Sequence, residues 1–265
     1  MGFLFLIFLF IIGACFGSFL CCMARRLHLK TSKPRQKLSS RSICLNCKTK
    51  LKWYDNLPII SWLLLKGKCR KCGQKIGIAE ILSELCLGLF FVLFGLAASL
   101  DNESLNLFLS GAPLTYFIHI LTFILILVLS FLAIYDGLYG ELPVLFLVIS
   151  IILAAVISFS DFSNFSLQSL ADTAFAVLIL GGTYLALYLV SKGKWVGDGD
   201  WLLCVAIALV LKSPWLALLT LFLSNFLACL IMFPKAKGKN RRIPFGPFLI
   251  SAFFIILAFS NYLVV

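Results

Sequence analysis

Two acidic residues at the edges of long apolar segments are the strongest candidates for chemistry. Asp136 ends an apolar run, and Asp200 closes the motif Gly197-Asp-Gly-Asp. Two carboxylates that share a confined site do not easily ionise together, so one keeps its proton while the other acts as a base on water. Peptide hydrolysis by an aspartyl protease requires this combination of a base and an acid. We therefore predict that Asp136 and Asp200 are catalytic.

Asp200 also has a purely structural interpretation. Gly197 and Gly199 permit a sharp turn, and an aspartate at the start of a helix would cap that helix or interact favourably with its dipole. The second aspartate, Asp136, ends another apolar segment, and we expect both segment ends to lie at the same face of a membrane. This favours the catalytic interpretation, with Asp200 rather than Asp198 in the active position. Neither histidine of the chain forms a convincing Ser/His or Cys/His constellation.

Four cysteines form two closely spaced pairs, Cys44-Leu-Asn-Cys47 and Cys69-Arg-Lys-Cys72. This spacing is typical of a tetrahedral zinc site, because each pair aims two thiolates at one ion. Four ligands without a spare histidine or carboxylate predict a closed, structural site. Two disulfides are an alternative, which a reducing cytoplasm disfavours, and redox catalysis by one pair is another. The other six cysteines lie in apolar segments and are predicted to be packing residues.

Three further acids lie in or near the cysteine-containing segment. Glu80 and Glu84 are one helical turn apart near the start of an apolar segment, where charged groups are costly and need a reason. Asp55 lies between the cysteine pairs, in polar sequence, and we expect it to be solvated.

The composition of the chain excludes a soluble globular domain. Of the 265 residues, 62% are hydrophobic, and the mean hydropathy is +1.05. Lipid must therefore be the solvent for most of the chain. The chain must cross the bilayer as helices of about 20 residues each. We predict an all-α polytopic membrane protein with about eight spans, near residues 3–23, 79–99, 115–135, 142–160, 172–191, 201–213, 215–233 and 246–264.

The basic residues predict the orientation of these spans. The net charge is +12, and 15 of the 23 Lys and Arg residues lie between Arg25 and Lys75. With eight spans, one face holds every basic residue except Lys212, and the positive-inside rule makes that face cytoplasmic. Asp136 and Asp200 then lie at the cytoplasmic face. Attraction to anionic membrane lipids explains the charge without a nucleic-acid partner.

Three regions are expected from these patterns. Residues 1–23 form an N-terminal transmembrane anchor, residues 24–78 form a cytoplasmic cysteine-rich insert, and residues 79–265 form a helical bundle that carries the two acids.

Taken together, the motifs resemble those of the bacterial prepilin peptidases (type IV leader peptidases), within the wider Gly-x-Gly-Asp membrane aspartyl proteases. Each motif is weak alone, and their order and spacing are specific. The motifs are Gly17-Ser-Phe19, Arg25-Arg-Leu27, Arg41-Ser-Ile-Cys44-Leu-Asn-Cys47, Asn56-Leu-Pro-Ile59, Gly67-Lys-Cys69-Arg-Lys-Cys72, Glu84, Asp136 with Pro143, Gly197-Asp-Gly-Asp200 and Ile243-Pro-Phe-Gly-Pro-Phe248.

The resemblance implies a multi-pass enzyme of the bacterial cytoplasmic (inner) membrane. Its substrates would be type IV prepilins or pseudopilins, including those of type II secretion, which carry a short basic leader before an apolar helix. Cleavage at the cytoplasmic face would use Asp136 and Asp200. The resemblance also implies N-methylation of the new amino terminus with S-adenosylmethionine, at a site that the sequence leaves unknown.

Two alternatives remain at this point. Another Gly-x-Gly-Asp intramembrane protease, of the presenilin or signal-peptide-peptidase type, would share the two acids. Such enzymes carry a Pro-Ala-Leu motif near the C-terminal end, which this chain lacks. A proton-coupled transporter would also use acids within a bundle, but here the acids gather at one face.

Overall fold

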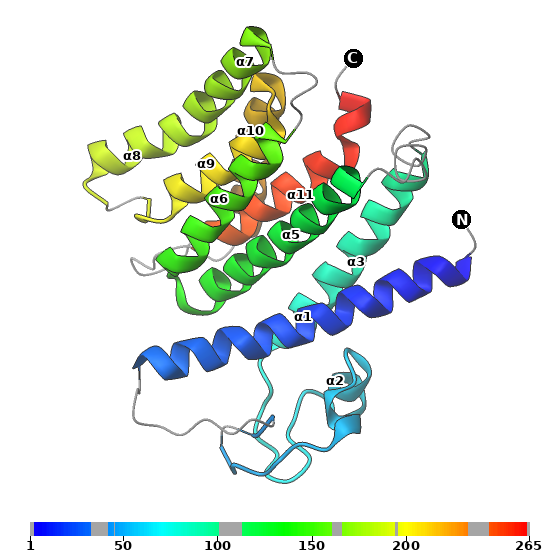
Figure 1. Ribbon diagram of the computed structural model, residues 1–265. Helices are drawn as coiled ribbons and strands as arrows, with labels where there is room; N and C mark the ends of the chain where they lie inside the picture. The colour runs from blue at the N-terminus through cyan, green and yellow to red at the C-terminus, as the bar shows by residue number, and fades with distance from the viewer. Residues whose placement is uncertain are drawn as a thin grey trace. The chain divides into compact units, whose positions relative to one another are not determined.

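The computed structural model describes residues 3–32, 42–44, 46–100, 113–160, 166–193, 196–232 and 244–263 (Figure 1). Regular structure in these ranges is helical, and the extended pairings are two isolated bridges, Ile43 with Lys50 and Lys68 with Lys75. The chain divides into two compact units, Met1–Leu100 and Asp101–Val265. The predicted all-α class is confirmed.

Within the described ranges, eight apolar helical segments fall on the eight predicted spans. Five of these segments are long and apolar enough to cross a membrane, and three are shorter. The five long segments lie in α1 (Phe3–Ser32), α3 (Ile78–Leu100), α5 (Pro113–Tyr139), the continuous run of α7 (Leu167–Val177), η3 (Leu178–Gly182) and α8 (Thr183–Ser191), and α10 (Pro214–Met232). The three shorter helices are α6 (Val144–Phe159), α9 (Asp200–Leu211) and α11 (Gly246–Leu263).

Helix α1 extends well beyond the apolar segment, ending at Ser32 rather than near residue 23. The added turns contain neither glycine nor proline, and arginine, lysine and leucine are good helix formers. At the end of the helix, the hydroxyls of Thr31 and Ser32 donate to the carbonyls of Leu27 and His28. A basic helical extension therefore leads out of the apolar part of α1.

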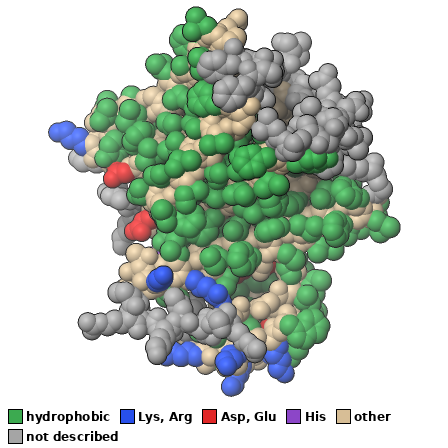
Figure 2. All heavy atoms as spheres, viewed as in Figure 1, with side chains coloured by type: hydrophobic (Ala, Val, Ile, Leu, Met, Phe, Trp, Pro, Cys, Tyr) green, Lys and Arg blue, Asp and Glu red, His purple; other side chains and the backbone are tan. Residues whose placement is uncertain are grey.

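In the view of Figure 2, hydrophobic side chains cover most of the described helical surface. Leu4, Leu145 and Phe222 are 80%, 68% and 67% exposed, respectively. In water such exposure would be strongly unfavourable, whereas lipid is as apolar as these side chains. The surface therefore agrees with the membrane environment that the composition predicts.

In the first unit, α1 and α3 pack closely through glycine. A Cβ atom on Gly13 would lie 2.6 Å from the carbonyl oxygen of Leu87, and one on Gly17 would lie 2.5 Å from that of Ser83. The Ser83 hydroxyl is 3.4 Å from the Gly17 carbonyl oxygen, to which it donates. Helices in lipid associate largely through such close backbone packing, which small residues permit.

In the second unit, α9 is the central helix. It contacts α6, α7, η3, α8, α10 and α11, and Leu203, Cys204, Ile207 and Ala208 are completely buried. A helix that is apolar on all sides is expected to be surrounded by protein or lipid. The π-helical turn η3 approaches α9 at Gly181, where a Cβ would lie 2.9 Å from Val205 Cγ2. The short α9 is therefore held by its neighbours.

Gly17→Ala should destabilise the first unit, because the added methyl would meet the α3 backbone, which cannot move aside without separating the helices. We expect a loss of about 1–3 kcal/mol, as for other overpacked sites, measured as a lower thermal midpoint in detergent. Gly95→Ala is the matched control, since its methyl would meet only the flexible end of Leu9. Equal midpoints for the two variants would contradict this packing.

Candidate active site and metal centre

Asp136 lies in the last turn of α5, which continues to Tyr139 instead of ending at the acid. Gly140 closes the helix with φ 68°, a left-handed conformation that glycine adopts readily, and its N–H donates to the Asp136 carbonyl at 2.7 Å. The side chain of Asp136 is only 4% exposed. Its Oδ2 accepts a hydrogen bond of 2.9 Å from the N–H of Gly246, the first residue of α11. The positive end of the α11 dipole favours this carboxylate.

Asp200 is the first residue of α9 and is 7% exposed. Its Oδ2 accepts a 2.9 Å hydrogen bond from the N–H of Gly197, and its own N–H donates to the Gly197 carbonyl. The N-cap of α9 is Gly199, which makes no side-chain cap. Asp200 is therefore not the N-cap of α9, although it lies in the first turn, where the helix dipole favours a carboxylate. Its side chain instead holds the glycine turn that precedes the helix.

Gly199 has a steric reason to lack a side chain. A Cβ there would lie 2.8 Å from Leu142 Cβ and 3.0 Å from Leu147 Cδ1. These leucines belong to the segment that joins α5 to α6 and to α6 itself. The glycine turn thus brings the start of α9 against the segment that follows Asp136.

The tertiary structure places the Asp136 and Asp200 carboxylates close enough to interact electrostatically. Helices α6 and α11 each contact both α5 and α9, the two helices that carry the acids. Asp198, the other acid of the glycine motif, is exposed, as is Glu141. Both buried and each held by a backbone amide, Asp136 and Asp200 form an interacting acid pair suited to general acid–base chemistry.

A group of polar and aromatic side chains near the acid pair was not predicted from the sequence. The buried ring of Tyr184 lies 5.1 Å from that of Phe245, the residue before the Gly246 amide. The Tyr184 hydroxyl accepts a 3.1 Å hydrogen bond from Asn225 Nδ2 on α10. Tyr184 follows the π-helical turn, and such turns often occur at functional sites. An irregular turn in a helix leaves no clear signal in an apolar sequence.

The four predicted ligand cysteines meet in the first unit. One sulfur from each of Cys44, Cys47, Cys69 and Cys72 lies within 4.8 Å of the others, and the sulfurs of Cys44 and Cys72 are 3.8 Å apart. Thiolates about 2.3 Å from a tetrahedral ion lie about 3.8 Å from one another. The cluster therefore fits a four-coordinate metal ion. All ten cysteines, each within the described residues, are free, which is contrary to the disulfide alternative.

The two cysteine pairs are built in the same way. In the first, the N–H of Cys44 donates to Thr49 and the N–H of Lys48 donates back to Cys44; in the second, Cys69 pairs likewise with Gln74 and Gly73. The residue after each second cysteine is left-handed, with φ 54° at Lys48 and 69° at Gly73. Each pair thus forms a tight knuckle that points two sulfurs the same way.

Hydrogen bonds within the knuckles favour thiolates. The pKa of Cys47 is lowered to about 6, first by the Thr49 side chain and then by the Thr49 backbone. Backbone amides of Cys72 and Lys71 lower the pKa of Cys69. The Cys47 backbone acts similarly on Cys44, but burial and the neighbouring thiols outweigh it and raise the Cys44 pKa to about 11. Metal binding would displace the remaining thiol protons.

The prediction that the Asp55 side chain is solvated is wrong. Its side chain is 8% exposed and lies 2.9 Å from a guanidinium nitrogen of Arg70, within the second knuckle. The Arg70 guanidinium also stands over the Tyr54 ring, 5.0 Å from its centroid. This pairing joins the two halves of the insert across a sequence separation that local patterns do not reveal.

Glu80 and Glu84 project from α3 toward the insert and α1. Glu80 Oε1 forms an ion pair with Arg25 at 2.5 Å, and Glu84 Oε2 accepts a 2.7 Å hydrogen bond from the Ile59 N–H. Ile59 has φ 62°, an unusual conformation for a β-branched residue. Glu84 therefore fixes a strained turn of the insert onto α3.

Comparison with known proteins places this architecture in a family. A family model described as the bacterial peptidase A24 N-terminal domain matches residues 11–98. Proteins named prepilin leader peptidase/N-methyltransferase are similar to this chain in Myxococcus xanthus (44% identity, 34% of this chain, 26% of the relative) and Vibrio cholerae (34% identity, 47% and 57%). The chain thus spans about a quarter and somewhat over half of these two relatives. No solved structure matches.

A relative from Neisseria gonorrhoeae with the same name is 33% identical over 221 residues, which is 83% of this chain and 71% of the relative. The helices and these similarities define a multi-pass membrane protein with a possible metal site. The chain belongs to the prepilin leader peptidase/N-methyltransferase family, peptidase A24.

Replacing both Cys44 and Cys72 by serine should remove the metal from the purified chain. Losing one ligand from each knuckle should weaken metal affinity by more than about a hundredfold, which elemental analysis after dialysis would detect. A double serine variant of Cys15 and Cys86, both exposed on apolar helices, is the control and should retain about one ion per chain. Equal metal content in both variants would rule out the cluster as the ligand set.

Proposed function

We propose that this protein is a prepilin leader peptidase in which Asp136 and Asp200 are the catalytic acids. The observation that carries the proposal is the buried pair itself. One oxygen of each carboxylate is held by a backbone amide, from Gly246 and Gly197 respectively. Family membership supports this function over a transporter or a protease of the presenilin type.

The reaction follows from the pair. Two neighbouring carboxylates repel each other when both are ionised, so one stays protonated while the other is ionised. The ionised acid takes a proton from a water molecule, which attacks the peptide carbonyl. The protonated acid donates its proton to the carbonyl oxygen, which gives a tetrahedral diol. As the C–N bond breaks, the acid that took the water proton gives it to the leaving amine, and the other acid regains a proton from a diol hydroxyl. Fixed amide donors keep both carboxylates oriented, which reduces the reorganisation that the transition state requires.

The distribution of charge supports cleavage at the cytoplasmic face. Residues 25–75 hold most of the basic residues, which the positive-inside rule assigns to the cytoplasm. A prepilin or pseudopilin has an apolar helix that would enter the bilayer and a basic leader that would remain at this face. We infer eight spans, with α6, α9 and α11 held within the bundle, and an inner-membrane location.

The proposed organisation keeps three regions: an anchor at 1–23, an insert at 24–78 and a bundle at 79–265.

We propose that the four-cysteine cluster binds structural zinc, since four thiolates suit Zn²⁺ and leave no open position. The relatives' names include N-methyltransferase. We extend that activity, with S-adenosylmethionine as methyl donor, to this chain. Membrane lipids are its expected surroundings, without nucleic acid.

Asp136→Asn and Asp200→Asn should each lower prepilin cleavage by at least about a hundredfold, because either change removes an acid or a base from the pair. Cleavage would be followed by gel mobility or mass spectrometry of a co-expressed prepilin in membranes. Asp198→Asn is the matched control and should cleave at nearly the normal rate, since Asp198 is exposed. Near-normal turnover by either Asp136→Asn or Asp200→Asn would contradict the proposed catalytic pair.

Gly246→Ala should also impair cleavage, although it removes no titratable group. The new Cβ would lie 2.8 Å from Asp136 Oδ2 and would push the carboxylate away from its amide donor. We expect kcat/KM to fall by about tenfold or more, since small misplacements of reacting groups are costly. Gly137→Ala is the control, because its Cβ would meet only Pro247 Cγ at 3.5 Å. The idea fails if both alanine variants cleave equally well.

A further inference from the structure

One side of the short helix α2 (Ile60–Leu64) in the insert is formed by large apolar side chains. Ile60, Leu63 and Leu64 share this side, since residues three and four apart lie on the same face of a helix. They are 55%, 58% and 77% exposed, respectively, and Figure 2 shows hydrophobic side chains gathered over α2 at the lower right. Such an exposed apolar group in a polar insert marks a contact with lipid or with protein.

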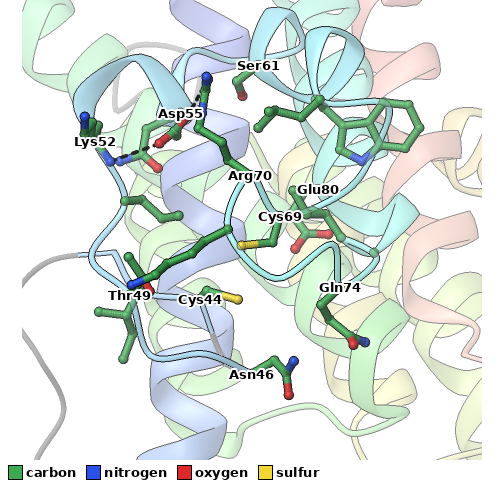
Figure 3. Close-up of a pocket in the computed structure, with 18 of the residues that line it drawn as sticks. Cys44, Asn46, Thr49, Lys52, Asp55, Ser61, Cys69, Arg70, Gln74 and Glu80 are labelled. Atoms are coloured by element: carbon green, nitrogen blue, oxygen red, sulfur yellow. Dashed lines mark hydrogen bonds and ion pairs between the residues drawn. The ribbon is translucent and has the colours of Figure 1, made fainter.

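The opposite side of α2 is fixed to the two apolar helices of the first unit. Ser61 lines a cavity together with Ser18 of α1 and Glu84 of α3, and Figure 3 shows Ser61 and Glu80 around the same space. Directly before α2, the Ile59 N–H donates to Glu84 Oε2 at 2.7 Å. Helix α2 therefore occupies a defined place beside α1 and α3, which are both long and apolar enough to cross a membrane.

The depth of this place follows from the two helices. Arg25 of α1 and Glu80 of α3 form an ion pair, with 28% and 24% of their side chains exposed, and so mark the polar boundary of the two helices. Ser18 precedes Arg25 by seven residues, which is about 10 Å along α1. Glu84 likewise lies one turn further into α3 than Glu80. The start of α2 is therefore held on the apolar side of this boundary.

The residues around α2 carry positive charge with little to oppose it. Asp55 is the single acid between residues 24 and 78, and it pairs with Arg70. Lys66 and Lys68 follow α2 closely and are exposed. The stem of a lysine can lie along apolar surface while its ammonium group reaches the lipid headgroups, and anionic headgroups attract such basic clusters. Apolar side chains beside exposed cations are typical of a helix that lies in the membrane interface.

A second protein chain is a weaker candidate for covering this side of α2. A stable protein interface buries about 800 Å² on each partner, whereas even three aromatic side chains bury only about 450–750 Å². The smaller side chains of Ile60, Leu63 and Leu64 offer less than this. Lipid requires no minimum area, because α1 and α3 already hold the chain in the bilayer.

We propose that α2 lies in the membrane interface, with Ile60, Leu63 and Leu64 among the lipid chains and Lys66 and Lys68 at anionic headgroups. The insert is then attached to the bilayer through this helix, in addition to its hydrogen bond to α3. This placement of α2 does not depend on the peptidase activity, because it follows from contacts within the first unit.

The test uses the full chain with its metal, in nanodiscs of phosphatidylethanolamine and phosphatidylglycerol whose acyl chains are either ordinary or brominated. Leu64→Trp adds one indole on the apolar side of α2, and its fluorescence is obtained by subtracting that of the natural chain. The added emission should be blue-shifted. It should lose at least about half of its intensity in brominated lipid, since interfacial helices bury their apolar side about 5–10 Å deep.

Lys30→Trp is the matched control. Lys30 is exposed and lies five residues beyond Arg25 on the polar end of α1, so its indole should emit as in water and be quenched little. Ile60→Trp, on the same side of α2 as Leu64, is measured in parallel, and metal content identifies the variants that keep a folded insert.

Two results would overturn the proposal. A blue-shifted emission that brominated lipid does not quench would show that protein covers α2, from this chain or from a second copy. Quenching of both α2 variants no stronger than that of Lys30→Trp, with emission as in water, would show that α2 stays in solvent. Strong quenching of either α2 variant supports the interfacial placement.

Discussion

Lipid offers no hydrogen bonds to the chain that it surrounds, and this constraint governs the whole molecule. Backbone groups inside the bilayer must pair within helices, so polar chemistry is concentrated where helices end and amides are unpaired. Asp136 lies in the last turn of α5, Asp200 begins α9, and the Gly246 amide begins α11. The candidate acids and their donors therefore meet at helix ends, where unpaired amides can hold a carboxylate.

The same solvent changes what holds the helices together. Lipid tails are as apolar as leucine, so helices associate through close packing rather than through exclusion of water. Glycine serves this purpose in both units: Gly13 and Gly17 bring α1 onto the α3 backbone, and Gly199 brings the start of α9 onto Leu142. At Gly246, the absence of a side chain allows an amide to reach the Asp136 carboxylate. Packing and chemistry therefore depend on the same residue type.

The insert solves a different problem, because it lies outside the apolar spans and has little core of its own. Between the end of α1 and the start of α3, the buried residues among those described are Gly67 and Cys69. Small domains of this kind usually require a metal or covalent crosslinks for stability. The four-sulfur cluster can supply that stability, and the Asp55–Arg70 pair and the Glu84–Ile59 hydrogen bond attach the halves of the insert to each other and to α3.

The sequence by itself determined the features that arise within short segments: the helices, since apolar length is a local property, the two cysteine knuckles, since their spacing is local, and the unusual acids Asp136 and Asp200. Tertiary structure alone decided which groups they meet. The amide at Gly246, the Arg70 partner of Asp55 and the ring of Tyr184 beside Phe245 all come from distant segments. Such pairs are fixed by how helices and turns pack, and no local pattern of residues shows which distant segments will come into contact.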